Sequence, residues 1–297
     1  MTDKAQEETL GLPINTGVCF STVRSEFNKR VMKRQLKTLE PLVAVLKQFL
    51  EPDETILFAV RGRSPVSTLE AMSTGWVIYY ARRCVLVVTS KRILHIPTRA
   101  NLRPKKSIAE VRYGDIATLK FRTFLGRALA LRYKSGKRET FSAIPSGEFK
   151  KLKVVLDALP KDGPASEAGE RRHLCPKCMS PLRKDTYACP TCRLEFKSRR
   201  QAVRKALLLP GGGWFYTGYP LLGVLYALIE VFLLVDIMLS LGEILAGLGG
   251  EEEWVQIVVS VGVLALEKSF VVLHARRSVD DYIPVGEDFV PIKSHAR

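Results

Sequence analysis

The sequence predicts a multidomain α+β membrane protein: a small β-barrel capped by a C-terminal helix, a metal-binding unit and an α-helical transmembrane hairpin. Three observations support this fold class. Between residues 52 and 159, short β-branched and aromatic runs alternate with turn residues, which is typical of strands. Two C-P-x-C pairs follow. The last third of the chain contains two apolar stretches long enough to cross a membrane.

Composition and charge restrict the partners and the compartment. The chain of 297 residues carries a formal net charge of +16, which favours polyanionic partners such as anionic lipid or nucleic acid, or the cytoplasmic face of a membrane. The first residues lack the basic and apolar segments of a signal peptide. Cys19 and Cys84 stand alone in apolar settings, and we expect them to be buried free thiols in a reducing compartment.

The N-terminal part is predicted in two segments. Residues 1–23 show no periodicity, and we expect them to be flexible. Residues 24–50 form a basic amphipathic helical segment, which Pro41 divides into two helices because the residue before a proline disfavours helical backbone. Its basic first half either lies on an acidic membrane surface or packs as a solvated face on the next domain.

Residues 51–160 are predicted to form one domain of about seven strands and a final helix. The helix covers "SGEFKKLKVVLDAL", in which Ser146 caps the first turn and Pro160 ends the helix. The expected strands lie in the runs "ETILFAV", "WVIYYA", "RCVLVVT", "RILHIPT", "SIAEVRY", "DIATLKF", "RALALRY" and "RETFSAI".

One strand–turn–strand motif within this domain resembles a known family. "VLVVTSKRILHIPT", with Thr89, Ser90, Lys91, Arg92 and Ile93 at the turn, resembles the signature of bacterial pleckstrin-homology-like (PH-like), GRAM-type domains. The resemblance covers about residues 50–160, includes the terminal helix, and implies a module that binds lipid or protein.

Basic residues are concentrated within the same domain. Residues 103–153 contain fourteen Lys or Arg and four acidic residues, for a net charge of +10. Alternate strand residues are polar in any case, but the low acid count favours a surface that faces a membrane or another polyanion. The predicted lipid- or partner-binding residues are Lys91, Arg92, Lys105, Lys106, Lys137 and Arg138.

Four paired cysteines follow a linker at residues 161–172. Cys175, Cys178, Cys189 and Cys192 form two C-P-x-C turns, and two residues between thiolates allow both sulfurs to reach one ion. Residues 173–196 resemble the short zinc ribbons of bacterial membrane proteins, which implies structural Zn²⁺. A rubredoxin-like iron site and a redox dithiol pair are the alternatives, and the adjacent His173 is expected to be a bystander.

The predicted transmembrane region is residues 203–275, with spans at about 219–243 and 254–274. Basic residues flank both spans and Glu251–Glu253 lie between them, so we expect both termini, including a tail at 276–297, in the cytoplasm. Before the first span, "PGGGWFYTG" contains P-G-x-G-x-x-Y-x-G. This motif resembles the one that leads into the helices of the bacterial two-helix transmembrane-pair family. In one possible topology, residues 206–218 form a re-entrant turn.

Ionisable residues lie at membrane depth within these spans, where each is costly and tends to be paired or functional. In an antiparallel hairpin a pair between Glu230 and Lys268 is geometrically feasible. Polar contacts between subunits are favoured over an ion pathway. The residues concerned are Glu230, Asp236, Glu267 and Lys268.

These features predict a non-enzymatic, multi-pass adaptor of the bacterial inner membrane that binds anionic lipids or a protein partner. We do not expect an enzyme, because the four histidines are scattered and the sequence contains no nucleophile–base set or phosphate loop. One alternative is a small transport or channel-forming homo-oligomer gated by the cytoplasmic module. Another is a membrane-tethered nucleic-acid binder, which is disfavoured because the cysteine unit offers few aromatic side chains for base stacking.

Overall fold

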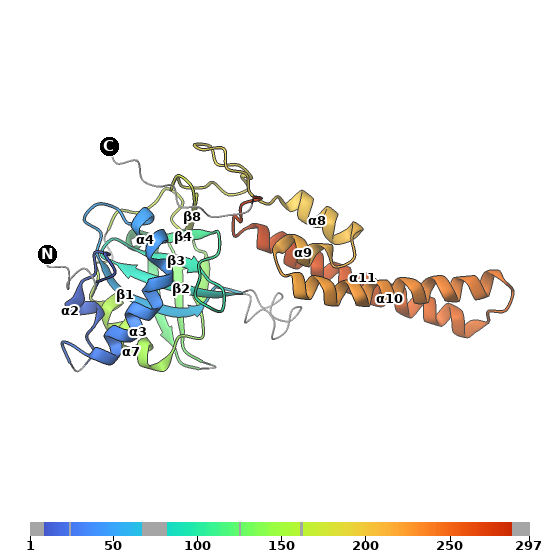
Figure 1. Ribbon diagram of the computed structural model, residues 1–297, viewed down its shortest axis with the longest axis horizontal. Helices are drawn as coiled ribbons and strands as arrows, with labels where there is room; N and C mark the ends of the chain where they lie inside the picture. The colour runs from blue at the N-terminus through green and yellow to red at the C-terminus, as the bar shows by residue number, and fades with distance from the viewer. Residues whose placement is uncertain (1–8, 24, 67–81, 125, 161–162, 287–297) are drawn as a thin grey trace. The chain divides into compact units, whose positions relative to one another are not determined.

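The computed structural model describes residues 9–23, 25–66, 82–124, 126–160 and 163–286. It divides into two compact units (Figure 1). The first is built mainly from the chain up to Leu194, and the second from Glu195–Val285. The chain is therefore a mixed α+β protein whose two apolar C-terminal helices form part of a separate unit.

The first unit contains two antiparallel sheets. An isolated bridge between Arg63 and Ser142 joins them at one corner. The larger sheet has the order β1 (Ile56–Arg63), β2 (Arg83–Thr89), β3 (Arg92–Pro97), β4 (Ile108–Arg112) and β8 (Arg172–Leu174). The smaller has the order β5 (Ile116–Arg122), β6 (Ala128–Tyr133) and β7 (Arg138–Phe141). A closed barrel stays a prediction.

The larger sheet is buried on both faces, which explains the continuous apolar sequence of β2. Leu86 and Val88 point into a core shared with the smaller sheet and with α7 (Ser146–Asp157). Val85 and Val87 point to the opposite face, where the N-terminal helices cover the sheet. These helices are α2 (Thr16–Cys19), α3 (Lys29–Leu39), η1 (Glu40–Leu42) and α4 (Val43–Phe49), and η2 (Tyr113–Asp115) links β4 to β5.

Three predicted features of this unit differ in the structure. Residues 9–23, expected to be flexible, include α2 and bury Cys19 and Phe20. Ser146 does not cap α7, whose N-cap residue is Pro145 without a side-chain cap. The linker continues directly into β8, so Arg172 already belongs to the sheet. Pro41 interrupts the N-terminal helices as predicted, and the run "WVIYYA" lies outside the described residues.

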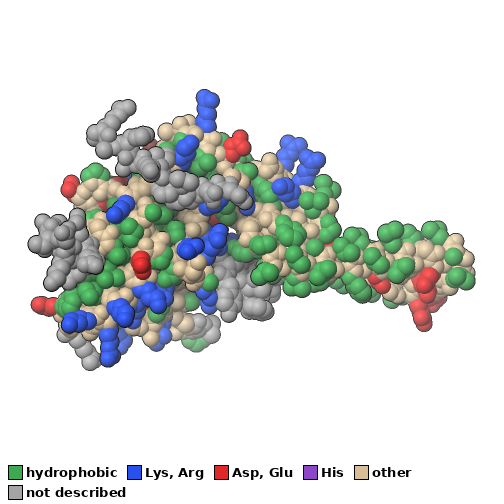
Figure 2. Space-filling view, viewed as in Figure 1, with side chains coloured by type: hydrophobic (Ala, Val, Ile, Leu, Met, Phe, Trp, Pro, Cys, Tyr) green, Lys and Arg blue, Asp and Glu red, His purple; other side chains and the backbone are tan. Residues whose placement is uncertain are grey.

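The second unit contains α8 (Arg199–Leu208), α9 (Gly212–Thr217), α10 (Pro220–Leu245) and α11 (Glu251–Val279). Helices α10 and α11 are long and apolar enough to cross a membrane by length and composition. In Figure 2 hydrophobic side chains cover the visible surface of this hairpin and acidic side chains gather at its loop end. Acidic residues in the first turn of α11 and Arg276 and Arg277 in its last turn complement the helix dipole.

The glycines before α10 allow close packing. Gly211 has a φ of 63°, and a Cβ on it would lie 2.0 Å from the carbonyl oxygen of Gly223. A Cβ on Gly213 would lie 2.3 Å from the Val271 side chain on α11. Segment 206–218 is therefore a helix end, a turn and a short helix packed on the hairpin, and glycine is required where the backbones meet.

Candidate metal centre and charged surfaces

The two C-P-x-C turns have the same backbone geometry. In each, the residue after the second cysteine, Met179 or Arg193, has a left-handed φ near 60° and donates its N–H to the carbonyl of the first cysteine, at 2.9 Å. The first cysteine of each turn, Cys175 or Cys189, donates its own N–H to a carbonyl five residues later, at 2.9 Å. The repeated turn points both sulfurs of each pair toward one centre.

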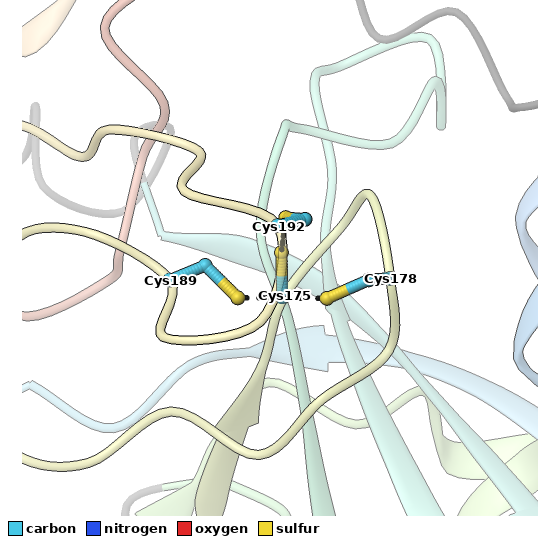
Figure 3. Close-up of side chains that lie close together, drawn as sticks. All are labelled: Cys175, Cys178, Cys189 and Cys192. Atoms are coloured by element: carbon cyan, nitrogen blue, oxygen red, sulfur yellow. Dashed lines mark hydrogen bonds between the residues drawn. The ribbon is translucent and has the colours of Figure 1, made fainter.

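The four sulfur atoms converge there (Figure 3). All lie within 4.8 Å of one another, with 3.5 Å between Cys175 and Cys192 and between Cys178 and Cys189. Sulfurs bound tetrahedrally at about 2.3 Å from zinc would be roughly 3.8 Å apart. The four thiols can therefore hold a metal ion. Burial raises the pKa of the Cys175 and Cys192 thiols. At Cys178 burial is outweighed by hydrogen bonds with Ser180, Cys189 and Cys192, which lower the pKa to about 7.

The four-cysteine cluster is attached to the larger sheet. Leu174, the last residue of β8, is buried in the core beneath the N-terminal helices. Gln48 of α4 donates its amide to the carbonyls of Pro176 and Lys177, at 3.2 and 3.4 Å. His173 pairs with Ala109 of β4 and is absent from the cluster of ligand atoms among the described residues.

The structure places Arg92 in the interior, which corrects its prediction as a surface-binding residue. Its side chain is 5% exposed and forms a two-point ion pair with Glu54, at 3.0 and 2.8 Å. A second carboxylate, Glu110, pairs with the same guanidinium. Thr89 accepts the N–H of Arg92 and donates to Glu54. The T-S-K-R motif therefore serves to build a buried charge network.

The other predicted binding residues differ in exposure and in their partners. Lys91 is exposed and donates to the Pro52 carbonyl, and Lys106 donates to the Gly286 carbonyl. Lys137 is 44% exposed but lies 3.3 Å from Glu139 and 3.6 Å from Glu170. Lys105 is partly buried and also has polar contacts. Arg138 is exposed on β7.

Arg138 belongs instead to a basic face that the sequence prediction missed. Lys120 and Arg122 of β5 are exposed at alternate positions, so their side chains share one face of the smaller sheet. Arg132 of β6 is exposed and pairs directly with Arg138 across the strands. A shallow groove of about 200 Å³ is lined by all four side chains. No carboxylate pairs with them in the described part of the chain. We call Lys120, Arg122, Arg132 and Arg138 the basic face.

The second unit holds the predicted ion pair. Lys268 Nζ lies 2.7 Å from Glu230 Oε2, and Glu230 is 1% exposed. Lys268 also donates to the Ala206 carbonyl at 2.9 Å, and Glu230 accepts the N–H of Gly211 at 3.2 Å. Both carboxylate oxygens of Glu267 are buried without a hydrogen-bond partner among the described residues. The pair thus ties the α8–α9 turn to both long helices.

Asp236 has separate partners nearer the loop end of the hairpin. It accepts from the side chains of Gln256 at 2.5 Å and Ser260 at 2.7 Å, both on α11. The two sets of polar contacts fasten α10 to α11 at different levels. Polar groups on such apolar helices satisfy each other, because water is scarce in apolar surroundings.

A buried Ser–His contact in the first unit was also not predicted from the sequence. Ser64 Oγ lies 2.8 Å from His95 Nε2, while Arg171 donates to His95 Nδ1 at 2.9 Å. Arginine has no acceptor, so Nδ1 accepts and the neutral imidazole carries its proton on Nε2. Burial, and then the Arg171 charge, lower the pKa of His95, which keeps it neutral. His95 therefore donates to Ser64 and cannot take its proton as a base would.

The comparisons with known proteins assign no family. No protein-family profile matches the chain, and no curated protein matches its sequence. A crystal structure of the C-terminal domain of a protein from Leishmania infantum aligns at 11% identity with a TM-score of 0.25. The alignment covers 43% of this chain and 95% of that domain.

Proposed function

We propose that the protein is a non-enzymatic membrane adaptor whose first unit binds anionic phospholipid headgroups. The second unit supplies the anchor in this proposal, with α10 and α11 crossing the inner membrane and both termini in the cytoplasm. Support for the orientation comes from the basic residues before α10 and after α11 and from the acidic residues of the loop. We further infer that the four cysteines hold structural Zn²⁺.

The basic face carries the proposal. Like charges directly opposite in an antiparallel pair destabilise a sheet, and Arg132 and Arg138 are such a pair. Lys120 and Arg122 add two further positive charges on the same face, again without a carboxylate partner in the described residues. An anionic surface would relieve this repulsion, because each basic residue near anionic lipid gains about 1 kcal/mol of attraction.

The strand order supports the resemblance to PH-like domains. Four consecutive strands of one antiparallel sheet are followed by three of another, and α7 then packs its apolar stripe into their shared core. A terminal helix after the strands is what the resemblance implies for residues 50–160. The Gly-dependent packing of segment 206–218 likewise gives a physical reason for the P-G-x-G-x-x-Y-x-G motif.

The test is sedimentation of fragment 1–198 with phosphatidylglycerol vesicles at low salt. Replacing the four residues of the basic face by Gln removes about four contributions of 1 kcal/mol, so we expect binding to weaken by up to roughly a thousandfold. High salt should likewise weaken vesicle binding by the wild-type fragment. Metal content and thermal unfolding of each fragment show that it is folded.

A matched variant removes the same charge elsewhere. Exposed basic residues outside the basic face, Lys153, Arg99, Lys177 and Lys184, are changed to Gln together. We expect this variant to bind within a few-fold of wild type. Equal losses in both variants would show diffuse attraction without a binding face. No vesicle binding by a folded wild-type fragment would overturn the lipid proposal and favour a protein partner.

Transport is the second candidate because charged groups lie within the hairpin. The contacts favour a structural role for them, since Lys268 is already bound by Glu230 and by the Ala206 carbonyl. Ion flux through proteoliposomes that disappears in Lys268→Met, with the fold retained, would support transport instead.

A further inference from the structure

The first unit contains a cavity of about 660 Å³ beside the N-terminus of α7. We call it the α7 cavity. It lies among α3, residues 21–23, the end of β5 and the first turn of α7, where Ser146 and Gly147 line it. Its volume is within the range of about 300–1,000 Å³ that is usual for small-molecule sites.

The lining combines an apolar wall with basic side chains. Val31, Phe58 and Phe149 are buried and supply the apolar part. Basic residues Arg34, Arg127, Lys150 and Lys151 supply four positive charges to the same lining. A ligand that satisfies both parts has an apolar chain and an anionic group.

Lys151 is the observation that points to an anion. It is 9% exposed, and its ammonium donates to Ser21 Oγ at 2.6 Å. Among the described residues no carboxylate pairs with it. A buried ammonium without a counter-charge is costly, and burial accordingly lowers the pKa of Lys151. The cavity that Lys151 lines is the place where a counter-anion fits.

Two further features add to the positive potential of the α7 cavity. Arg127 and Lys150 are exposed and have no carboxylate partner in the described part of the chain, whereas Arg34 is paired with Glu148 at 3.2 Å. Helix α7 is 12 residues long and lacks a side-chain cap. The N–H groups of Glu148 and Phe149 donate to the Pro145 carbonyl at 3.0 Å, which leaves those of Ser146 and Gly147 for another acceptor.

We propose that the α7 cavity binds an anionic amphiphile, with its phosphate against Lys151, Lys150 and the first turn of α7. The acyl chain then lies on Phe58 and Phe149. This inference rests on the proposed lipid function and deepens it by naming a second site, the α7 cavity, that is separate from the basic face. It predicts recognition of one lipid molecule in addition to attraction to a charged surface.

The test uses the full chain, loaded with zinc and held in a non-ionic amphipol. Binding of dihexanoyl phosphatidic acid is measured by calorimetry, with dihexanoyl phosphatidylcholine and inorganic phosphate as comparison ligands. We expect Lys151→Met to weaken phosphatidic acid binding at least tenfold, because a charge-assisted hydrogen bond is lost. Lys150→Gln should weaken it several-fold, and the matched change Lys153→Gln on the same helix should not.

Stability provides a second readout. Removing an uncompensated buried charge while keeping side-chain volume should leave the thermal unfolding temperature of Lys151→Met equal to or above that of wild type. If Lys151 serves only to hold Ser21, the variant should instead be less stable and bind normally.

Each other outcome has a definite meaning. Equal affinity for inorganic phosphate would overturn the amphiphile and indicate a free-phosphate site. Equal affinity for phosphatidylcholine, or equal losses in Lys150→Gln and Lys153→Gln, would overturn anion recognition by the cavity. Normal phosphatidic acid binding by the Gln variant of the basic face, together with its loss of vesicle binding, would establish two sites. If the wild type binds vesicles but does not bind dihexanoyl phosphatidic acid, the proposal for the α7 cavity is refuted and the proposal for the basic face is not.

Discussion

Replacement of Arg92 by Met tests whether the T-S-K-R motif builds the interior or binds a ligand. Met retains much of the side-chain length and removes the charge. The change leaves Glu54 and Glu110 buried, each with a side chain 0% exposed, and leaves the Phe49 carbonyl without the guanidinium N–H that it accepts at 2.6 Å. Glu110 keeps Arg172 and Arg112, but Glu54 loses its two-point ion pair.

The expected loss can be estimated from these contacts. Removing one partner of a buried ion pair costs about 3–5 kcal/mol, because the remaining charge is left uncompensated. The unsatisfied Phe49 carbonyl adds about 1–3 kcal/mol. A domain is stable by only about 5–15 kcal/mol, so Arg92→Met should remove a large share of the free energy of unfolding. At a urea dependence of about 2–3 kcal/mol per molar, the midpoint should fall by about 1.3–4 M.

The assay is urea unfolding of fragment 1–198, followed by circular dichroism, with Lys91→Met as the matched control. Lys91 is 41% exposed, so its loss should change stability by less than about 1 kcal/mol. Adding Glu54→Gln to Arg92→Met should restore part of the stability, because a neutral amide is less costly to bury than a carboxylate. An Arg92→Met fragment as stable as Lys91→Met, but unable to bind vesicles, would refute the structural role.

The pH dependence has a definite sign. Burial raises the pKa of Glu110, but the hydrogen bond and charge of Arg92 outweigh it and hold that pKa below its usual value. In wild type this contribution is present above the unfolded pKa of about 4.3 and is lost as pH falls through the lower folded pKa. In Arg92→Met the hydrogen bond and the charge of Arg92 no longer oppose the effect of burial, so the pKa of Glu110 rises. The deficit in the free energy of unfolding should therefore be full near pH 7 and shrink as pH falls below about 4.3.

Three further predictions concern the metal, the topology and the membrane pair. Fragment 1–198 should bind about one zinc per chain by elemental analysis, and Cys192→Ser should lose it; iron in its place would contradict zinc. A cysteine at Glu252 of the full chain, in a cysteine-depleted background, should react with an impermeant maleimide in intact cells, whereas labelling at Ser294 would reverse the topology. Lys268→Met should lower the thermal unfolding temperature in detergent, with partial rescue by Glu230→Gln; additive effects would contradict the pair.

The strands and long helices were predictable because their sequence periods are strong. Runs such as "RCVLVVT" carry β-branched residues that favour a strand, and the structure forms β2 there. Spacing alone also located the four cysteines, since a C-P-x-C turn is a local structure. The order of residues within a short segment determines these features.

The roles of the charged residues were harder to predict, because they depend on contacts between segments that are distant in the sequence. Nothing in "TSKR" shows that Glu54 and Glu110 will meet Arg92 from other strands and loops. The basic face required knowing that β5 and β6 pair so that Lys120, Arg122 and Arg132 share one surface. The charge count over residues 103–153 detected the excess of basic residues, but it could not show on which face of the sheet each of them lies.

The position of the metal centre follows from the same tertiary contacts. Strand β8 has only three residues, too few to hold an edge position by backbone hydrogen bonds alone, yet it covers β4 and brings Arg172 to Glu110. Cys175 comes directly after this strand, and Gln48 holds the turn that it begins. A metal bound by the four thiols would therefore fix an edge strand as well as a small loop unit. We expect loss of such a metal to release β8, expose the edge of β4 and weaken the Glu110 network, which would couple metal binding to the stability of the sheet.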